Sequence, residues 1–148
     1  MDPYTAFPNG PLPEFQDGFW GRQRLAQDPS RGLVIWALQY GFGAGSSPNG
    51  IRIAVANAAA NPDSETLPWN YYDLTAANLG TRAGMTIETH QLQVSNNWLY
   101  LSVNVFNPSD SSAVNGGIIR ISLDALAAGG TLGVNGLQFY NPSDAPSD

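Results

Sequence analysis

The 148-residue sequence has no cysteine and no lysine, and charged residues make up only 12% of it. Without cysteine there is no disulfide framework, no thiolate nucleophile and no cysteine-ligated zinc. Six arginines stand against twelve acidic residues, so the net charge is −6. Because proteins bind nucleic acid through a basic surface that neutralises phosphates, this balance excludes nucleic acid as the expected partner.

Long apolar runs are also missing. No stretch approaches the ~18 to 20 residues that a membrane-spanning helix needs, and the start MDPYTAFPNG lacks the basic and apolar regions of a signal peptide. The polar residues are mainly Asn, Ser, Thr and Gln, a balance typical of extracellular β proteins. We therefore expect an extracellular or cell-surface protein whose signal peptide is absent from this chain; an intracellular protein is the alternative.

Short strand-like segments follow one another along most of the chain. GLVIWALQYG at 32–41 and IRIAVANA at 51–58 are apolar on both faces, which indicates buried strands. NNWLYLSVNVF at 96–106 begins with a tight turn and then alternates between two faces. In IIRISLDAL at 118–126, a strand is followed by one short helical turn. The sequence therefore predicts an all-β fold.

The order of these segments repeats. The triplet IRI stands at 51–53 and again at 119–121, 68 residues later, and WNYYDL at 69–74 corresponds to LQFYN at 137–141. Each unit contains four short strands, as a propeller blade does. We divide the chain into a Pro- and aromatic-rich N-terminal arm (1–21), two blade-like repeats (22–80 and 81–141) and a polar C-terminal tail (142–148).

These segments resemble the blade strands of large secreted bacterial β-propeller proteins of unassigned function. The resemblance covers roughly residues 22–141 and rests on strand texture and order. It implies a propeller with four strands per blade, an extracellular setting and no catalytic residues. Closed propellers need about four blades or more, so a two-unit chain is expected to form a homo-oligomeric ring or to be part of a larger propeller. A single β-sandwich, with the units packed face to face, is the alternative.

Two arginines lie inside apolar strands, where an unpaired charge would be costly. We expect Arg52 and Arg120 to form structural ion pairs, with Asp73 and Asp124 as their carboxylate partners.

Two aspartates occur in a repeated Asn-Pro-Ser-Asp sequence. Asp110 and Asp144 carry oxygen ligands suited to calcium, although Asn-Pro and Ser-Asp are also ordinary turn sequences. We predict no cofactor and no metal site, with calcium at these two aspartates as the alternative. The single histidine, His90, lies two residues after Glu88, so strand alternation places both on one side.

Aromatic side chains are the candidate ligand-binding groups, because their rings offer large apolar surfaces. The proposed set is Trp69, Tyr71, Trp98 and Tyr100, with Asn104 as a polar member. No nucleophile elbow, phosphate-binding loop or dinucleotide fingerprint is present. We predict no enzymatic activity: the chain is a structural or binding module that self-assembles through propeller-like repeats. The alternatives are a glycan-binding lectin with aromatic and Asn/Asp pockets repeated around an oligomeric ring, and a carboxylate-dependent hydrolase.

Overall fold

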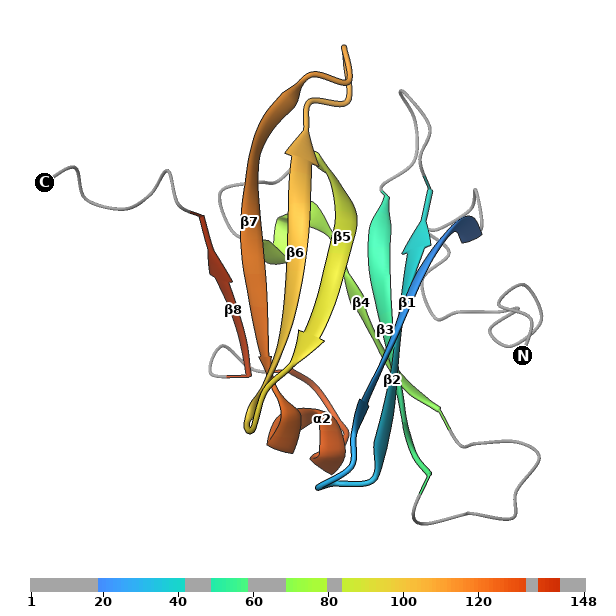
Figure 1. The fold of residues 1–148 in the computed structure, drawn as a ribbon. Helices are drawn as coiled ribbons and strands as arrows, with labels where there is room; N and C mark the ends of the chain where they lie inside the picture. The colour runs from blue at the N-terminus through green and yellow to red at the C-terminus, as the bar shows by residue number, and fades with distance from the viewer. Residues whose placement is uncertain (1–18, 42–48, 59–68, 80–83, 133–135, 142–148) are drawn as a thin grey trace, which may run out of the picture.

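The computed structural model describes residues 19–41, 49–58, 69–79, 84–132 and 136–141. These residues form two antiparallel four-stranded sheets (Figure 1), so the all-β expectation with two units of four strands is confirmed. Sheet A has the order β1-β2-β3-β4 and sheet B the order β5-β6-β7-β8. The strands are β1 (Phe19–Asp28), β2 (Leu33–Tyr40), β3 (Gly50–Asn57), β4 (Asn70–Leu74), β5 (Thr86–Val94), β6 (Trp98–Phe106), β7 (Ala113–Ser122) and β8 (Leu137–Tyr140), with a 3-10 turn η1 (Ala76–Leu79).

The predicted short helix follows β7 directly as α2 (Leu123–Ala128). The hydroxyl of Ser122 caps its N-terminus by accepting a hydrogen bond from the Ala125 backbone N–H at 3.2 Å. The helix ends at Gly129, whose φ of 71° suits a residue without a side chain. It lies at the end of the molecule where the β1–β2 and β5–β6 turns also lie (Figure 1).

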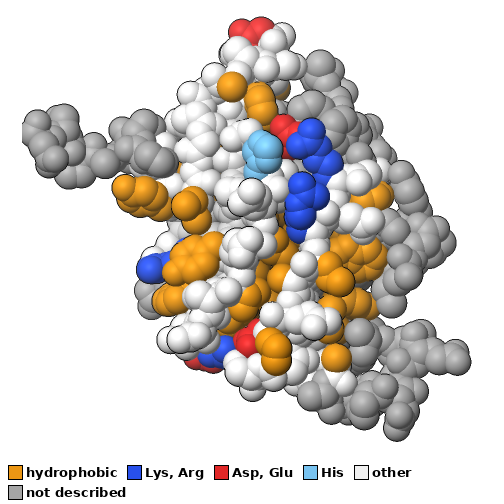
Figure 2. Space-filling model, viewed as in Figure 1, with side chains coloured by type: hydrophobic (Ala, Val, Ile, Leu, Met, Phe, Trp, Pro, Cys, Tyr) orange, Lys and Arg blue, Asp and Glu red, His pale blue; other side chains and the backbone are white. Residues whose placement is uncertain are grey.

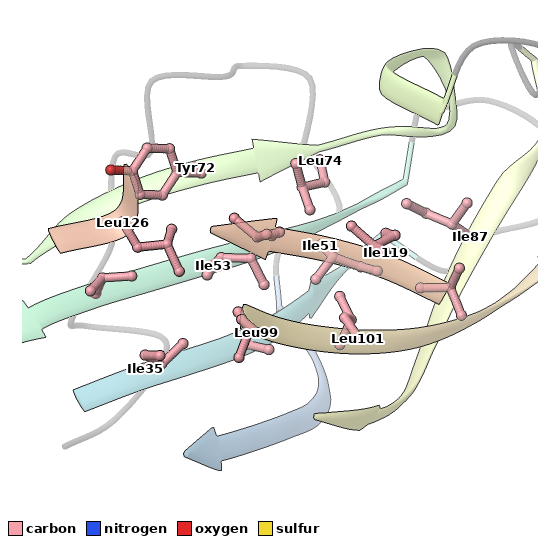
Figure 3. Packing of buried hydrophobic residues seen from close by; sticks show 14 of the residues in the cluster. Ile35, Ile51, Ile53, Tyr72, Leu74, Ile87, Leu99, Leu101, Ile119 and Leu126 are labelled. Carbon is pink, nitrogen blue, oxygen red and sulfur yellow. The ribbon is translucent and has the colours of Figure 1, made fainter. Parts of the chain in front are cut away.

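One hydrophobic core joins the two sheets (Figure 3). Strand alternation sends every second residue of β6 inward, as its regular burial pattern shows. Complete burial of such aliphatic side chains stabilises the fold by about 1.5–3 kcal/mol each. The inward residues labelled in Figure 3 are Ile35, Ile51, Ile53, Tyr72 and Leu74 from sheet A, and Ile87, Leu99, Leu101 and Ile119 from sheet B, with Leu126 from α2.

The other side of each sheet is its outer face, and both outer faces are rich in aromatic residues. A second, smaller hydrophobic cluster lies on sheet A. The outer face of sheet A includes Leu25, Trp36, Leu38, Tyr40, Arg52, Ala54 and Tyr71, and the outer face of sheet B includes Trp98, Tyr100, Asn104, Ile118, Arg120, Gln138 and Tyr140.

The two sheets meet through opposite faces of their four-strand units. The carbonyls of Gly32 and Asn97 lie just before β2 and β6, and each accepts a hydrogen bond from the backbone N–H just beyond the third strand of its sheet, at 2.9 and 3.0 Å. These two residues are therefore equivalent in the hydrogen-bond ladders. The next residue of β2, Leu33, lies in the core, whereas the next residue of β6, Trp98, lies on the outer face. The units are thus stacked head to tail and are not related by a two-fold axis.

The repeated IRI triplets correspond only in part. Both lie in the third strand of their sheet, with the arginine on the outer face. Arg52 is opposite Leu38, near the end of β2, whereas Arg120 is opposite Tyr100, near the start of β6. The repeated triplet therefore identifies the third strand of each sheet and the outward direction of its arginine. The two arginines do not occupy equivalent positions along their strands.

The predicted N-terminal arm ends earlier than expected, because β1 begins at Phe19. This strand is at the edge of sheet A, and its pairing is interrupted between Phe19 and Gln23, where Gly21 has a φ of 89°. An edge strand tolerates such an irregularity because only one neighbour must match it. Residues 1–18 and the predicted tail, 142–148, lie outside the described residues.

Candidate functional site

The structure contains the expected ion pair between Arg52 and Asp73. Arg52 Nε and Nη2 donate to the two carboxylate oxygens at 2.6 and 2.7 Å, and the arginine side chain is only 1% exposed. Its guanidinium also lies 5.0 Å from the ring centre of Tyr40 and 4.7 Å from that of Tyr71. Burial opposes the positive charge, but the Asp73 carboxylate outweighs it and raises the pKa of Arg52. This arginine is fully engaged in holding sheet A together.

The expected second ion pair, between Arg120 and Asp124, does not form. Cross-strand partners in a sheet lie directly opposite each other, and the residue opposite Arg120 in β8 is Gln138, whose side-chain oxygen accepts a hydrogen bond from Nη2. The guanidinium rests 4.2 Å from the ring centre of Trp98. Asp124 belongs to α2, its side chain is 78% exposed, and it pairs with Arg31 at 2.7 Å.

The five predicted ligand-binding residues do not form one site. Trp98, Tyr100 and Asn104 follow the two-residue alternation of β6 onto the outer face of sheet B. Tyr71 is on the outer face of sheet A beside Arg52, and the Trp69 ring packs 5.9 Å from that of Trp36 on the same sheet. The prediction grouped these residues by type, but the two sets lie on opposite outsides of the two-sheet stack.

A pocket of about 650 Å³ lies on the outer face of sheet B, within the range of about 300–1,000 Å³ usual for small-molecule sites. Hydrophobic side chains gather over this sheet, with a basic side chain among them (left side of Figure 2). The pocket is lined by Tyr100, Ile118, Arg120, Gln138, Phe139 and Tyr140. Of these, only Tyr100 was predicted as ligand-binding. The others were not predicted, because the sequence does not show which residues of β6, β7 and β8 lie opposite one another.

His90 and Glu88 lie on the edge where β5 passes β1, but strand alternation does not relate them as predicted. The pairing of β5 with β6 skips His90 between Thr89 and Gln91, so His90 is the extra residue of a bulge. Glu88 is buried and forms an ion pair with Arg22 of β1. The histidine, two arginines and the acidic group are visible together near the centre of Figure 2.

Two buried amides, Gln39 of β2 and Asn49 just before β3, close the free edge of β5. Asn49 donates to the Ile87 carbonyl at 2.6 Å and accepts from its N–H at 2.9 Å. Gln39 donates to the same carbonyl at 3.0 Å and accepts from the Thr89 N–H at 3.0 Å. These side chains replace the strand that an edge lacks, and they fix the position of sheet B against sheet A.

Arg31 connects the two units at their other end. It pairs with Asp28 at 2.8 Å and with Asp124 of α2 at 2.7 Å, and it donates to the Asn96 carbonyl in the β5–β6 turn at 2.9 Å. Burial acts against the ionised form of Asp28, but hydrogen bonds from Ser30 and Arg31 lower its pKa. Arg31 was not predicted, because the two partners that make it a link between the units, Asn96 and Asp124, are distant in the chain.

The predicted calcium residue Asp110 serves a local turn. Its carboxylate accepts hydrogen bonds from the N–H and the hydroxyl of Ser112 at 2.9 and 2.7 Å, and these bonds lower its pKa. Asp144 lies outside the described residues. Within the described part of the chain, no group of three or more His, Cys, Asp or Glu residues is placed to hold a metal ion.

The described helices include none that is long and apolar enough to span a membrane. The chain matches no protein-family model, no curated protein and no solved structure. The resemblance to propeller blades therefore stays a prediction.

Proposed function

We propose that this chain is a non-catalytic, self-assembling module whose copies stack head to tail, with the outer face of sheet B of one copy against the outer face of sheet A of the next. The head-to-tail stacking of the two sheets within the chain carries the proposal. Because of this stacking, the outer face of sheet B corresponds to the inner face of sheet A. In the same way, the outer face of sheet A corresponds to the inner face of sheet B. A contact between two copies would therefore repeat the junction already present inside one chain.

The exposed apolar residues support the same two surfaces. Five large hydrophobic side chains are exposed in the described part of the chain, and four of them lie on the outer faces. Leu25 and Tyr71 belong to sheet A, and Ile118 and Tyr140 belong to sheet B. The fifth, Val114, is the extra residue of a bulge in the pairing of β6 with β7. Exposed apolar groups that gather on one surface mark a site of association.

Repeated head-to-tail contacts give a closed ring when the rotation divides a full turn, and a fibre otherwise. We propose a ring, because two or more copies of a two-unit chain supply the four or more blades that a closed propeller requires. An extracellular or cell-surface setting belongs to the proposal, since the polar residues are mostly uncharged. Hydrolysis has less support, because Glu88 is buried and paired with Arg22.

The test is the absolute mass in solution, measured by light scattering after size exclusion at several concentrations. The wild-type chain should form one discrete oligomer. Leu25→Glu damages only the outer face of sheet A and Ile118→Glu only that of sheet B, so each variant alone should be monomeric. Ala127→Glu, on the exposed side of α2, is the charge-matched control and should assemble as the wild type does.

Mixing the two defective variants tests the direction of the contact. Each variant keeps one intact face, and the two intact faces are complementary. The mixture should therefore form a one-to-one dimer that does not grow further. A monomeric wild type would disprove self-assembly, and a mixture that stays monomeric would disprove head-to-tail contact.

A further inference from the structure

We infer that the pocket on the outer face of sheet B binds a saccharide that carries a carboxylate, and that Arg120 receives the carboxylate group. Arg120 is the charged member of the pocket lining. The inference concerns a ligand of the single chain and does not depend on self-assembly.

The other strongly engaged arginines show how this chain normally neutralises a guanidinium. Arg22 pairs with the Glu88 carboxylate, Arg31 with two aspartates, and Arg52 with Asp73. In a chain with twice as many acidic as basic residues, carboxylate partners are abundant. Among the described arginines, Arg24 and Arg120 contact no carboxylate, and Arg24 donates to two backbone carbonyls instead. Arg120 is the one of these two that lines the pocket.

Arg120 is held in place by neutral groups. One Nη2 hydrogen bond goes to the Gln138 oxygen, and Trp98 lies against the guanidinium at 4.2 Å. A guanidinium has five N–H donors in a planar fork, so most of its donors stay available. The cation–π contact fixes the orientation of that fork without neutralising its charge. A carboxylate is the group that such a fork binds best, through two parallel charge-assisted hydrogen bonds.

The rest of the lining suits a sugar ring. Tyr100 and Tyr140 provide aromatic surface for the apolar face of a pyranose. The ring of Phe139 packs against the core, so it adds no aromatic wall on this face. The Gln138 side-chain oxygen already accepts from Arg120, which leaves its NH2 group as a donor for a hydroxyl. Aromatic walls with a few polar groups are the usual composition of a ligand site, and the arginine adds selectivity for acid.

Ile118 and Tyr140 belong both to the pocket and to the surface proposed to associate, so a copy stacked on this face would compete with the saccharide. The binding test therefore uses Leu25→Glu, which lies on the outer face of sheet A and leaves the pocket intact. In this background a failure of assembly and a failure of ligand binding are separate results. If the wild type proves monomeric, the same measurement is made on the wild-type chain.

The probes are α-1,4-trigalacturonate and the same trisaccharide with its carboxyls methyl-esterified, both measured by isothermal titration calorimetry. We expect the acid to bind about tenfold or more tightly than the ester, because the ester loses charge-assisted bonds. Arg120→Gln should reduce acid binding to the level of the ester and leave ester binding unchanged. Arg120→Lys keeps the charge but not the fork, and should fall between. Tyr140→Ala should weaken both probes.

A second readout needs no variant of the pocket arginine. The indole N–H resonance of Trp98, assigned with Trp98→Phe, should shift on titration with the acid and less with the ester. Raising the salt concentration should weaken acid binding selectively. Equal affinity for acid and ester, an unaltered affinity in Arg120→Gln, or no binding of either probe would each overturn the inference.

Discussion

Replacing Gln39 with methionine should lower the free energy of unfolding by about 3 kcal/mol. The substitution leaves one buried backbone N–H without a partner and removes two hydrogen bonds to backbone carbonyls. The Gln39 side chain is fully buried and joins sheet A to β5. Its Nε2 donates to the carbonyls of Ile87 at 3.0 Å and Gly50 at 3.1 Å, and its Oε1 accepts from the Thr89 N–H at 3.0 Å. Methionine keeps the length of the side chain but makes none of these bonds.

The magnitude follows from what each backbone group retains. The Ile87 carbonyl still accepts from Asn49 at 2.6 Å, so it loses a bond without becoming unsatisfied. The Thr89 N–H loses its side-chain partner at a buried edge, which costs about 1–3 kcal/mol. Each of the two lost carbonyl bonds contributes about 0.5–1.5 kcal/mol, and low values are appropriate because carbonyls tolerate fewer partners better than N–H groups do.

The assay is urea unfolding followed by tryptophan fluorescence, carried out in the Leu25→Glu background so that association does not add to the measured stability. Gln93→Met, at an exposed position of β5, is the matched control and should change stability by less than about 0.5 kcal/mol. If Gln39→Met is as stable as this control, the amide does not close the edge of β5, and the account of how the sheets are held together is wrong.

Three further results are expected. Asp73→Asn should cost about 3–5 kcal/mol in urea unfolding, because it leaves the buried Arg52 charge without its carboxylate. Gly117→Ala should cost about 1–3 kcal/mol and displace β8, since the added Cβ would lie 2.8 Å from a backbone carbonyl of that strand; an unchanged melting temperature would contradict this packing. The folded-state pKa of Asp28 lies below its ordinary 3.8. The ionised carboxylate therefore contributes fully to the free energy of unfolding above pH 3.8, and this contribution is lost as the pH falls through the lowered pKa. Asp28→Asn should therefore flatten the acid limb of a stability-versus-pH curve, and an unchanged limb would refute this role.

The strands could be predicted from the sequence because their signals are local. The predicted strand GLVIWALQYG at 32–41 is observed as β2, Leu33–Tyr40, which ends inside the glycines at both of its ends. Alternation along β6 placed Trp98, Tyr100 and Asn104 on one face. Each of these inferences uses only neighbours within a few residues, which is the range over which period and turn chemistry act.

Contacts between the units could not be predicted in this way. In the sequence, Gln39 and Asn49 are ordinary polar residues. Their amides gain hydrogen-bond partners only because β5 lies next to them in the fold. The exchange of partners at Asp124 has the same origin, because α2 carries that aspartate away from Arg120 and toward Arg31. The bulge at His90 shifts the later part of β5 by one residue, which no composition signal marked. Register and strand order decide each of these outcomes.

The chemistry of the sheet faces also distinguishes the permanent junction between the two sheets of one chain from the proposed reversible contact between copies. The inner faces meet mainly through isoleucine, leucine and valine, whose burial desolvates no polar atoms. The amides of Gln39 and Asn49, which are buried at the same junction, are hydrogen-bonded to β5. The outer faces combine Trp98, Tyr100, Tyr140 and Arg120 on one side with Leu25 and Tyr71 on the other. Tryptophan, tyrosine and arginine are enriched where protein surfaces associate and carry most of the binding energy there. Because their polar atoms must give up water in forming the contact, stacking between copies should be weaker than stacking within the chain, and the assembly should dissociate before its units unfold.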